Sequence, residues 1–372
     1  MKKDNNVKAF FALVRAGLWE KDVQLLPLDN IDFAEVQRFA EEQSVLGLVA
    51  AGLDHVTDLK VPKKDVLQIV SQTLLFEQRN DAMNYFIGII VEKLRDAGIY
   101  ALLVKGQGVA RCYERPSWRS CGDVDLLLDA MNYEKAKAYL TPLAASVEEE
   151  DKKVKHLGMN IDTWVVELHG TLHGGISKRV NSVIDEVQDD TFKNGHVRVW
   201  ENNETSVFLP ALDNDAIFIF VHFVDHFFRG GLGLRQICDW CRLLWTYRKE
   251  IDVDLLEKRV RDMGLLDEWR AFATYAVVYL GMPVEAMPLY ETGYKWKRKA
   301  TRMNSYIMEV GNFGHNRDHS FYEKYPYLVY KVISLGRHIG DFFRHLMIFP
   351  KNSFNVFCGT FFGGLRAMTK GR

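Results

Sequence analysis

The sequence predicts an α+β protein in which a small mixed sheet is flanked by N-terminal and C-terminal helical regions. Apolar residues recur at helical spacing through residues 32–53 and 66–97. From Ile99 onward, short apolar runs separated by polar residues and glycines indicate strands. Helical spacing returns after Pro210. The expected division is a helical region over residues 1–98, an α/β core over 99–212 and a mostly helical region over 213–372.

Both N-terminal helices have recognisable ends. Asp32 precedes the first helix, where its carboxylate can accept hydrogen bonds from the free amides of the first turn. Gly98 follows the second helix, at the position where glycine ends many helices. The sequence therefore predicts one helix over residues 32–53 and another over 66–97.

The core is expected to alternate strands with short helices. A strand over residues 99–105 leads into a short helix over 106–113, and an apolar strand follows at 124–128. The later expected elements are a helix at 132–140, strands near 145–149, 154–161, 163–169 and 205–209, helices at 216–228 and 234–247, and loops around 311–320.

Asp123 and Asp125 stand one residue apart inside an apolar stretch. Side chains alternate along a strand, so both carboxylates should project from one face, with Cα atoms roughly 6.5–7 Å apart. Val124 and Leu126 should then point into the core. Mg²⁺ prefers one or two carboxylates together with phosphate oxygens, so the pair suits phosphoryl or nucleotidyl chemistry. A solvated strand end is the alternative reading of the same triplet.

Basic residues and glycine precede this pair. Lys105 ends an apolar strand and Gly106 opens the next helix, where backbone amides favour an anion and glycine allows phosphate to approach. Lys105 could pair with a triphosphate as a point charge; the alternative is a solvated lysine at a strand end. Arg119 is a second phosphate candidate, or it neutralises the acidic residues.

These residues together resemble the nucleotidyltransferase fold of the DNA polymerase β superfamily. More closely, the chain resembles an uncharacterised bacterial nucleotidyltransferase family over most of its length. That family's signature of Lys-Gly, a short helix, Tyr, Pro, Arg and Asp-apolar-Asp is matched by Lys105, Gly106, Tyr113, Pro116, Arg119, Asp123 and Asp125. The core over 99–212 is therefore expected to be a nucleotidyltransferase core.

The resemblance also implies roles for further residues. A third acid usually joins the pair from a neighbouring strand, and Glu167, within a Glu-Leu-His sequence, matches it; the competitor Asp162 fits a turn better. The three acids are the implied metal ligands and catalytic residues. The implied nucleotide-binding residues are Lys105, Gly106, Gln107 and Arg119, and the implied acceptor-side residues are His169, His222, His226, Arg235 and Asp239.

The expected activity is transfer of a nucleoside monophosphate from an NTP to a hydroxyl, with Mg²⁺ or Mn²⁺ as the metal. The acceptor, which could be a small molecule, a protein or RNA, is not identified by the sequence. A hydrolase or kinase using the same metal pair is one alternative. A catalytically silent nucleotide-binding or protein-interaction module is the other.

Composition bears on location and partners. The five cysteines, an odd number, do not suggest a disulfide framework, and no apolar run reaches the ~18 residues of a spanning helix. Arg15 interrupts the first apolar run, so no signal peptide and no transmembrane segment are expected, and the protein should be cytoplasmic.

Residues 294–372 hold 14 Lys and Arg against 4 Asp and Glu. This basic region should bind an anionic partner or dock against the acidic remainder.

Three further patterns do not indicate a separate metal or catalytic site. Cys238 and Cys241 form a lone C-x-x-C at helical spacing, more typical of two core thiols than of a zinc site. His222 lacks the following Glu of a metalloprotease motif. The remaining pattern is an aromatic stripe expected in the core, comprising Phe218, Phe220, Phe223, Phe227 and Phe228.

Overall fold

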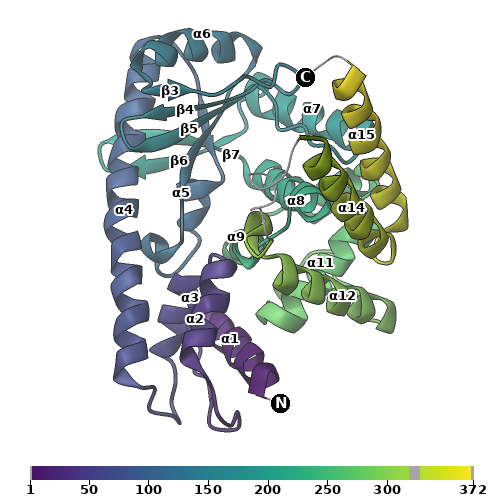
Figure 1. Ribbon diagram of the computed structural model, residues 1–372. Coiled ribbons are helices and arrows are strands. Elements are labelled where there is room, and N and C mark those ends of the chain that lie inside the picture. Colours follow the sequence, from purple (N-terminus) through teal and green to yellow (C-terminus); the bar gives the residue numbers. More distant parts are fainter. Residues whose placement is uncertain (1, 318–326, 370–372) are drawn as a thin grey trace.

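The computed structural model describes residues 2–317 and 327–369 (Figure 1). The N-terminal helices are α1 Lys2–Trp19, α2 Phe33–Glu42, α3 Leu46–Leu53 and α4 Lys63–Asp96. Helix α4 is the longest of the four, and it runs beside both the sheet and the other N-terminal helices (Figure 1). Gly98 follows it with φ +67°, which confirms the predicted helix end.

The first expected helix is two helices in the structure. Asp32 caps α2 as predicted, with its carboxylate accepting a 3.4 Å hydrogen bond from the Glu35 amide. The chain then turns at Ser44, which has φ +56° and whose hydroxyl accepts a hydrogen bond from Asn312 at 2.8 Å. Gln43 in the same turn donates to a carbonyl of the C-terminal region at 3.1 Å. A continuous helix over 32–53 was wrong because these distant partners hold the turn.

The central sheet is mixed, as predicted, with strand order β1-β2-β5-β4-β3. Strand β2 pairs parallel with β5, and the other neighbouring pairs are antiparallel. The strands are β1 Leu102–Val104, β2 Asp123–Leu127, β3 Ser146–Val147, β4 His156–Ile161 and β5 Trp164–His169. Short helix α5 Gly106–Ala110 follows β1, and α6 Ala130–Leu140 follows β2. Strand β1 and helix α5 are both shorter than expected.

The chain beyond the sheet adds a hairpin and a helical region. The elements are α7 Lys178–Lys193, β6 Val197–Asn202, β7 Thr205–Pro210, α8 Leu212–Arg229, α9 Leu234–Thr246, α10 Val253–Met263, α11 Leu266–Leu280, α12 Tyr294–Val310, α14 Tyr327–Leu346 and α15 Pro350–Thr369. Helix α7 and strand β6 were not expected. None of the described helices combines the length and apolar character needed to cross a bilayer.

The buried apolar side chains of the described residues form two separate cores. Val124 and Leu126 lie, as predicted, in an apolar core shared with α4 and α6. A second core joins α1 to α3 with α8 to α12. Because α4 packs with the sheet and the other N-terminal helices pack with the C-terminal ones, each of the two cores combines regions separated in sequence. The boundaries at residues 98 and 212 remain a prediction.

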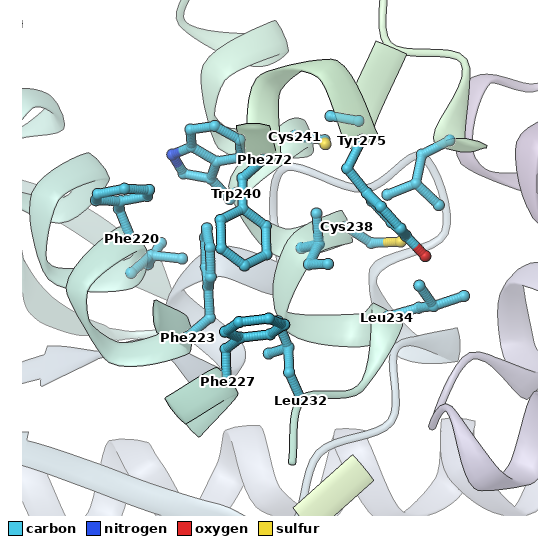
Figure 2. Close-up of a cluster of buried hydrophobic side chains, with 14 of the residues drawn as sticks. Phe220, Phe223, Phe227, Leu232, Leu234, Cys238, Trp240, Cys241, Phe272 and Tyr275 are labelled. Atoms are coloured by element: carbon cyan, nitrogen blue, oxygen red, sulfur yellow. The ribbon is translucent and has the colours of Figure 1, made fainter. Parts of the chain in front are cut away.

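The aromatic stripe of α8 lies in the second core, as expected. All five phenylalanines of the stripe are at most 6% exposed. Figure 2 shows three of them, Phe220, Phe223 and Phe227, packed beside Trp240 and Phe272. Cys238 and Cys241 are free thiols in the same buried cluster (Figure 2). These residues therefore stabilise the helices that carry the neighbouring site.

Candidate active site

Strand pairing brings three carboxylates together. Asp125 on β2 is the direct partner of Glu167 on β5, and Asp123 projects from the same face as Asp125. Carboxylate oxygens of all three residues lie within 4.8 Å of one another. Asp162, the competitor, lies in the turn between β4 and β5 with φ +53°. The geometry thus groups Glu167, and not Asp162, with the aspartate pair.

Lys105 closes the cluster from the end of β1. Its Nζ lies 2.9 Å from Oδ1 of Asp125. Burial disfavours the charged ammonium, but Asp125, and then Glu167 and Asp123, outweigh burial and raise the pKa of Lys105. The backbone of Lys105 has φ +57° and ψ −144°, an unusual conformation for a residue with a Cβ, and Gly106 follows with φ +43°. Such conformations are concentrated at functional sites.

Two histidines, His156 and His169, also contact the carboxylates. Nε2 of His169 lies 2.7 Å from Oδ1 of Asp125 and 3.4 Å from Oε2 of Glu167. Nε2 of His156 lies 3.1 Å from the same Glu167 oxygen. Burial opposes ionisation of Glu167, but hydrogen bonds from both histidines lower its pKa below its usual range. Likewise, burial acts against the His169 cation, yet Asp125 and Glu167 raise its pKa.

Charge in the cluster is incompletely balanced. Burial raises the pKa of Asp125, but Lys105 and then His169 reverse this effect and lower it. Asp123 differs, because burial and the neighbouring Asp125 raise its pKa despite Lys105. Asp123 is therefore the carboxylate that the side chains around it compensate least, as expected where a bound cation is to be added.

A second ionic group lies on the opposite wall. Asp239 on α9 accepts two hydrogen bonds from the Arg119 guanidinium, both at 2.7 Å, and a third from the Tyr113 hydroxyl at 2.7 Å. Burial opposes the charge of Arg119, but Asp239 dominates and raises its pKa well above the usual value. The pair is buried and bidentate, and it joins the loop before β2 to α9.

Helices α8 and α9 complete a cleft above the sheet face. Burial, then Lys105, lowers the pKa of His222 well below its usual value, and the same causes lower that of His226 to about 4. Both imidazoles are therefore neutral at pH 7. The lining residues are Lys105, Gly106, Val109, Arg119, Asp123, Asp125, Glu167, Ile219, His222, His226, Arg235, Gln236, Asp239 and Phe313.

Most residues proposed from the sequence surround this cleft. Arg235 lines it and donates to the Ser120 carbonyl at 2.9 Å. His169 reaches the cluster through its bonds to Asp125 and Glu167. Neither His169 nor Gln107 lines the cleft itself, and the Gln107 amide donates away from it, to Asn80 of α4 at 2.9 Å. The nucleotide-binding role of Gln107 remains a prediction.

Sequence reasoning missed several residues of the site, among them His156, Gln236 and Phe313. His156 is paired with His169 across β4 and β5, a relationship that depends on strand register. Gln236 lines the cleft beside Arg235 on α9, one helical position from a residue that was identified. Phe313, in the turn Asn312–Gly314, packs against His226, with the two ring centroids 4.9 Å apart. Its distance along the chain from the sheet left no local signal.

The mixed sheet and its acidic face define the class of fold, a nucleotidyltransferase-type α+β core flanked by helices. Residues 29–281 match the family described as "Uncharacterised nucleotidyltransferase". This match covers more than half of the 372 residues, so the chain belongs to that family. No curated protein and no solved structure matches the chain. The superfamily and the bacterial origin remain predictions.

Proposed function

We propose that the protein transfers a nucleoside monophosphate from an NTP to a hydroxyl acceptor, using Mg²⁺ or Mn²⁺. The observation that carries the proposal is the convergence of Asp123, Asp125 and Glu167 at a cleft that Lys105 also lines. Family membership supports the class of reaction. The identity of the NTP and of the acceptor depends on experiment.

The residues fit a hard divalent cation. Carboxylate oxygens are the protein ligands that Mg²⁺ accepts, and it retains water and phosphate oxygens as further ligands. Asp123, Asp125 and Glu167 would hold the metal. When bound, the metal supplies charge neutralisation and Lewis acidity at the phosphates.

The protein side chains orient the reactants. Lys105, whose Nζ now contacts Asp125, exchanges that contact for a phosphate oxygen and balances charge on the leaving pyrophosphate. His169 donates to Asp125 and Glu167 and so keeps their oxygens directed into the cluster. In the reaction, the acceptor oxygen forms a bond to the α-phosphorus of the NTP. The bond between the α-phosphorus and the oxygen that bridges it to the β-phosphate breaks, and its electron pair leaves with the pyrophosphate. The acceptor proton leaves to a carboxylate of this face or to water.

The activity test pairs nucleotide adducts with pyrophosphate release. The protein is incubated with each NTP, Mg²⁺ and a cell extract, and adducts are identified by mass spectrometry. We expect adducts and pyrophosphate with wild type, and neither with Asp125→Ala or with excess chelator. Equal Mg²⁺-NTP binding by wild type and Asp125→Ala, without pyrophosphate from either, would refute the transferase proposal. NTP binding that needs Asp125, without turnover, would instead indicate the silent binding module, and phosphate release would indicate a hydrolase.

The basic C-terminal region has internal partners that favour docking. Lys295 and Lys299 of α12 lie within 3.3 Å of Asp267 on α11, which is outside the basic region. Arg344 is paired within the basic region, 2.8 Å from Glu309. These contacts use part of the positive charge within the protein. An anionic partner remains a proposal for the rest of residues 294–372, of which 318–326 and 370–372 lie outside the described residues. Binding to nucleic acid and to anionic vesicles across a salt series tests it. The cytoplasmic location also remains a prediction.

A further inference from the structure

We propose that His156, Glu167 and His169 form a second metal site, selective for a divalent transition-metal ion. One nitrogen of each histidine and one oxygen of Glu167 all lie within 4.8 Å of one another. The site adjoins the proposed Mg²⁺ ligands and shares Glu167 with them. It goes beyond nucleotidyl transfer, and metal binding can be measured without any nucleotide.

The hydrogen-bonded contacts among these side chains also have separations that suit ligands of one metal ion. Nε2 of His156 and Nε2 of His169 both approach Oε2 of Glu167, at 3.1 and 3.4 Å. Zinc-type bonds of about 2.0–2.1 Å separate adjacent ligands by roughly 2.9–3.4 Å for angles between octahedral and tetrahedral values. Both measured separations fall within this range. A metal ion can therefore be accommodated between the three side chains with small displacements, provided that Nε2 of each histidine releases its proton and that His169 exchanges its hydrogen bond to Asp125 for the metal.

Strand pairing holds these ligands in place. His156 on β4 is the direct partner of His169 on β5, and their ring centroids are 4.9 Å apart. Glu167 precedes His169 by two residues, so both side chains project from the same face of β5. Sites built on strands are better preorganised than sites on loops. His156 is partly exposed, with one third of its side chain accessible, which leaves a route for the ion from solvent.

The donor set indicates the class of metal. Two imidazole nitrogens with one carboxylate are the ligands of many catalytic zinc sites and of 2-His-1-carboxylate iron sites. Mg²⁺ prefers oxygen ligands, so it should favour the aspartate side of the cluster. Because Glu167 contacts both ligand groups, a hard ion and a transition-metal ion could occupy neighbouring positions.

The test uses Co²⁺ as a spectroscopic probe on the full chain, stripped of metal by chelation. Co²⁺ is titrated in the presence of excess Mg²⁺, and binding is followed by visible ligand-field absorption and by elemental analysis. We expect one tightly bound Co²⁺ per chain, with a rise in melting temperature as binding stabilises the folded state. His156→Ala should weaken Co²⁺ binding by at least about 100-fold, the upper range for loss of a supporting residue.

His55→Ala is the matched control. Nε2 of His55 lies 2.5 Å from a carboxylate oxygen of Glu20, so this variant also removes a histidine paired with an acid. It should bind Co²⁺ as wild type does. Circular dichroism without metal establishes that both variants are folded. If His156→Ala proves unfolded, His156→Gln, which keeps a polar side chain, takes its place.

Two results would overturn the proposal: wild type that binds no Co²⁺ in excess Mg²⁺, or a folded His156 variant that binds it as tightly as wild type. These outcomes are separate from failure of the proposed transferase activity. Loss of pyrophosphate release in Asp125→Ala can be observed whether or not Co²⁺ binds. Conversely, Co²⁺ binding that depends on His156 would establish the metal site even in a protein without transferase activity.

Discussion

The two walls of the cleft hold buried or half-buried carboxylates in opposite states of charge compensation. On the helical wall, Asp239 accepts three hydrogen bonds of 2.7 Å from Arg119 and Tyr113. On the sheet wall, three carboxylates share the lysine Lys105 and the histidines, and the pKa of Asp123 is raised by burial and by Asp125. We call the first group the clamp, comprising Tyr113, Arg119 and Asp239, and the second the acidic face, comprising Asp123, Asp125 and Glu167.

This difference separates a structural role from a ligand-binding role. Removing one partner of a buried matched pair leaves an uncompensated charge and costs several kcal/mol. Removing an acid from a group with excess negative charge relieves repulsion in the folded protein. Stability and activity should therefore respond in opposite ways to substitutions on the two walls.

The largest effect is expected at the acidic face. Asp123→Asn should lower nucleotidyl transfer by at least about 1,000-fold, because a metal ligand stabilises several kcal/mol of transition-state charge. Its free energy of unfolding in chelator should stay within about 1 kcal/mol of wild type or rise, because the raised pKa means that folding disfavours the ionised acid. Pyrophosphate release and urea unfolding measure the two quantities. A large loss of stability would show that Asp123 is structural.

The clamp should show the reverse behaviour. Asp239→Asn should lower the free energy of unfolding by about 3–5 kcal/mol, because Arg119 stays buried without its carboxylate. Urea unfolding measures this loss. Asp239→Leu combined with Arg119→Met should recover part of it, since neither charge remains. A single variant as stable as wild type would contradict the structural role of the clamp.

A further buried carboxylate, outside the cleft, extends the comparison to the pH dependence of stability. Burial raises the pKa of Glu268 on α11 to about 7 from its usual 4.5, although Asn352 of α15 donates to it at 2.9 Å. The folded state thus retains the proton more strongly than the unfolded state. The contribution of Glu268 to the free energy of unfolding is therefore fully present below pH 4.5. It is lost as the pH rises to about 7, which lowers the stability by about 3 kcal/mol.

Glu268→Gln should remove that pH dependence. Between pH 5 and pH 8, wild type should lose about 2–3 kcal/mol more stability than the variant, because the other titrating groups are common to both. Urea unfolding at the two pH values gives the difference directly. Equal losses in the two proteins would show that Glu268 ionises normally in the folded state.

The smallest effect is expected at Lys105, which connects the acidic face to the nucleotide. Lys105→Ala should raise the Kd for Mg²⁺-NTP about tenfold and slow turnover, because one cation is lost near the phosphates. Calorimetric titration and steady-state kinetics measure these changes. Combined with Asp125→Ala, the effects should not add fully, because both residues act on the same bound nucleotide. Full additivity would place Lys105 outside the nucleotide site.

Local sequence patterns predicted most elements of the core, and they also contain the signal for a helix that was overlooked. Alternation along β2 predicted that Val124 and Leu126 would be buried, and both are at most 1% exposed. Helix α7 was missed although Ser177 caps it, with its hydroxyl accepting from the Val180 amide at 3.2 Å. The buried positions that follow have helical spacing and were available in the sequence. This omission was an error of interpretation and not a limit of the sequence.

The partners of the charged residues were less predictable. Arg119 was considered a phosphate ligand or a counter-ion of the acidic face, whereas the structure pairs it with Asp239, 120 residues later. The role of Arg119 in nucleotide binding stays a prediction. To bind a phosphate, Arg119 would have to weaken or share its ion pair with Asp239. Charge and position in the sequence identify a cation, but they do not determine which of several acids it meets.

By itself, the sequence determined what local spacing controls: the helical regions, and the shared face of Asp123 and Asp125, because side chains alternate along a strand. The tertiary structure decided what depends on non-local pairing. The parallel register of β2 with β5 places Glu167 beside Asp125, and the antiparallel register of β4 with β5 places His156 beside His169. A shift of one residue in either register would turn these side chains to opposite faces. The composition of the site therefore depends on the packing that selects those registers.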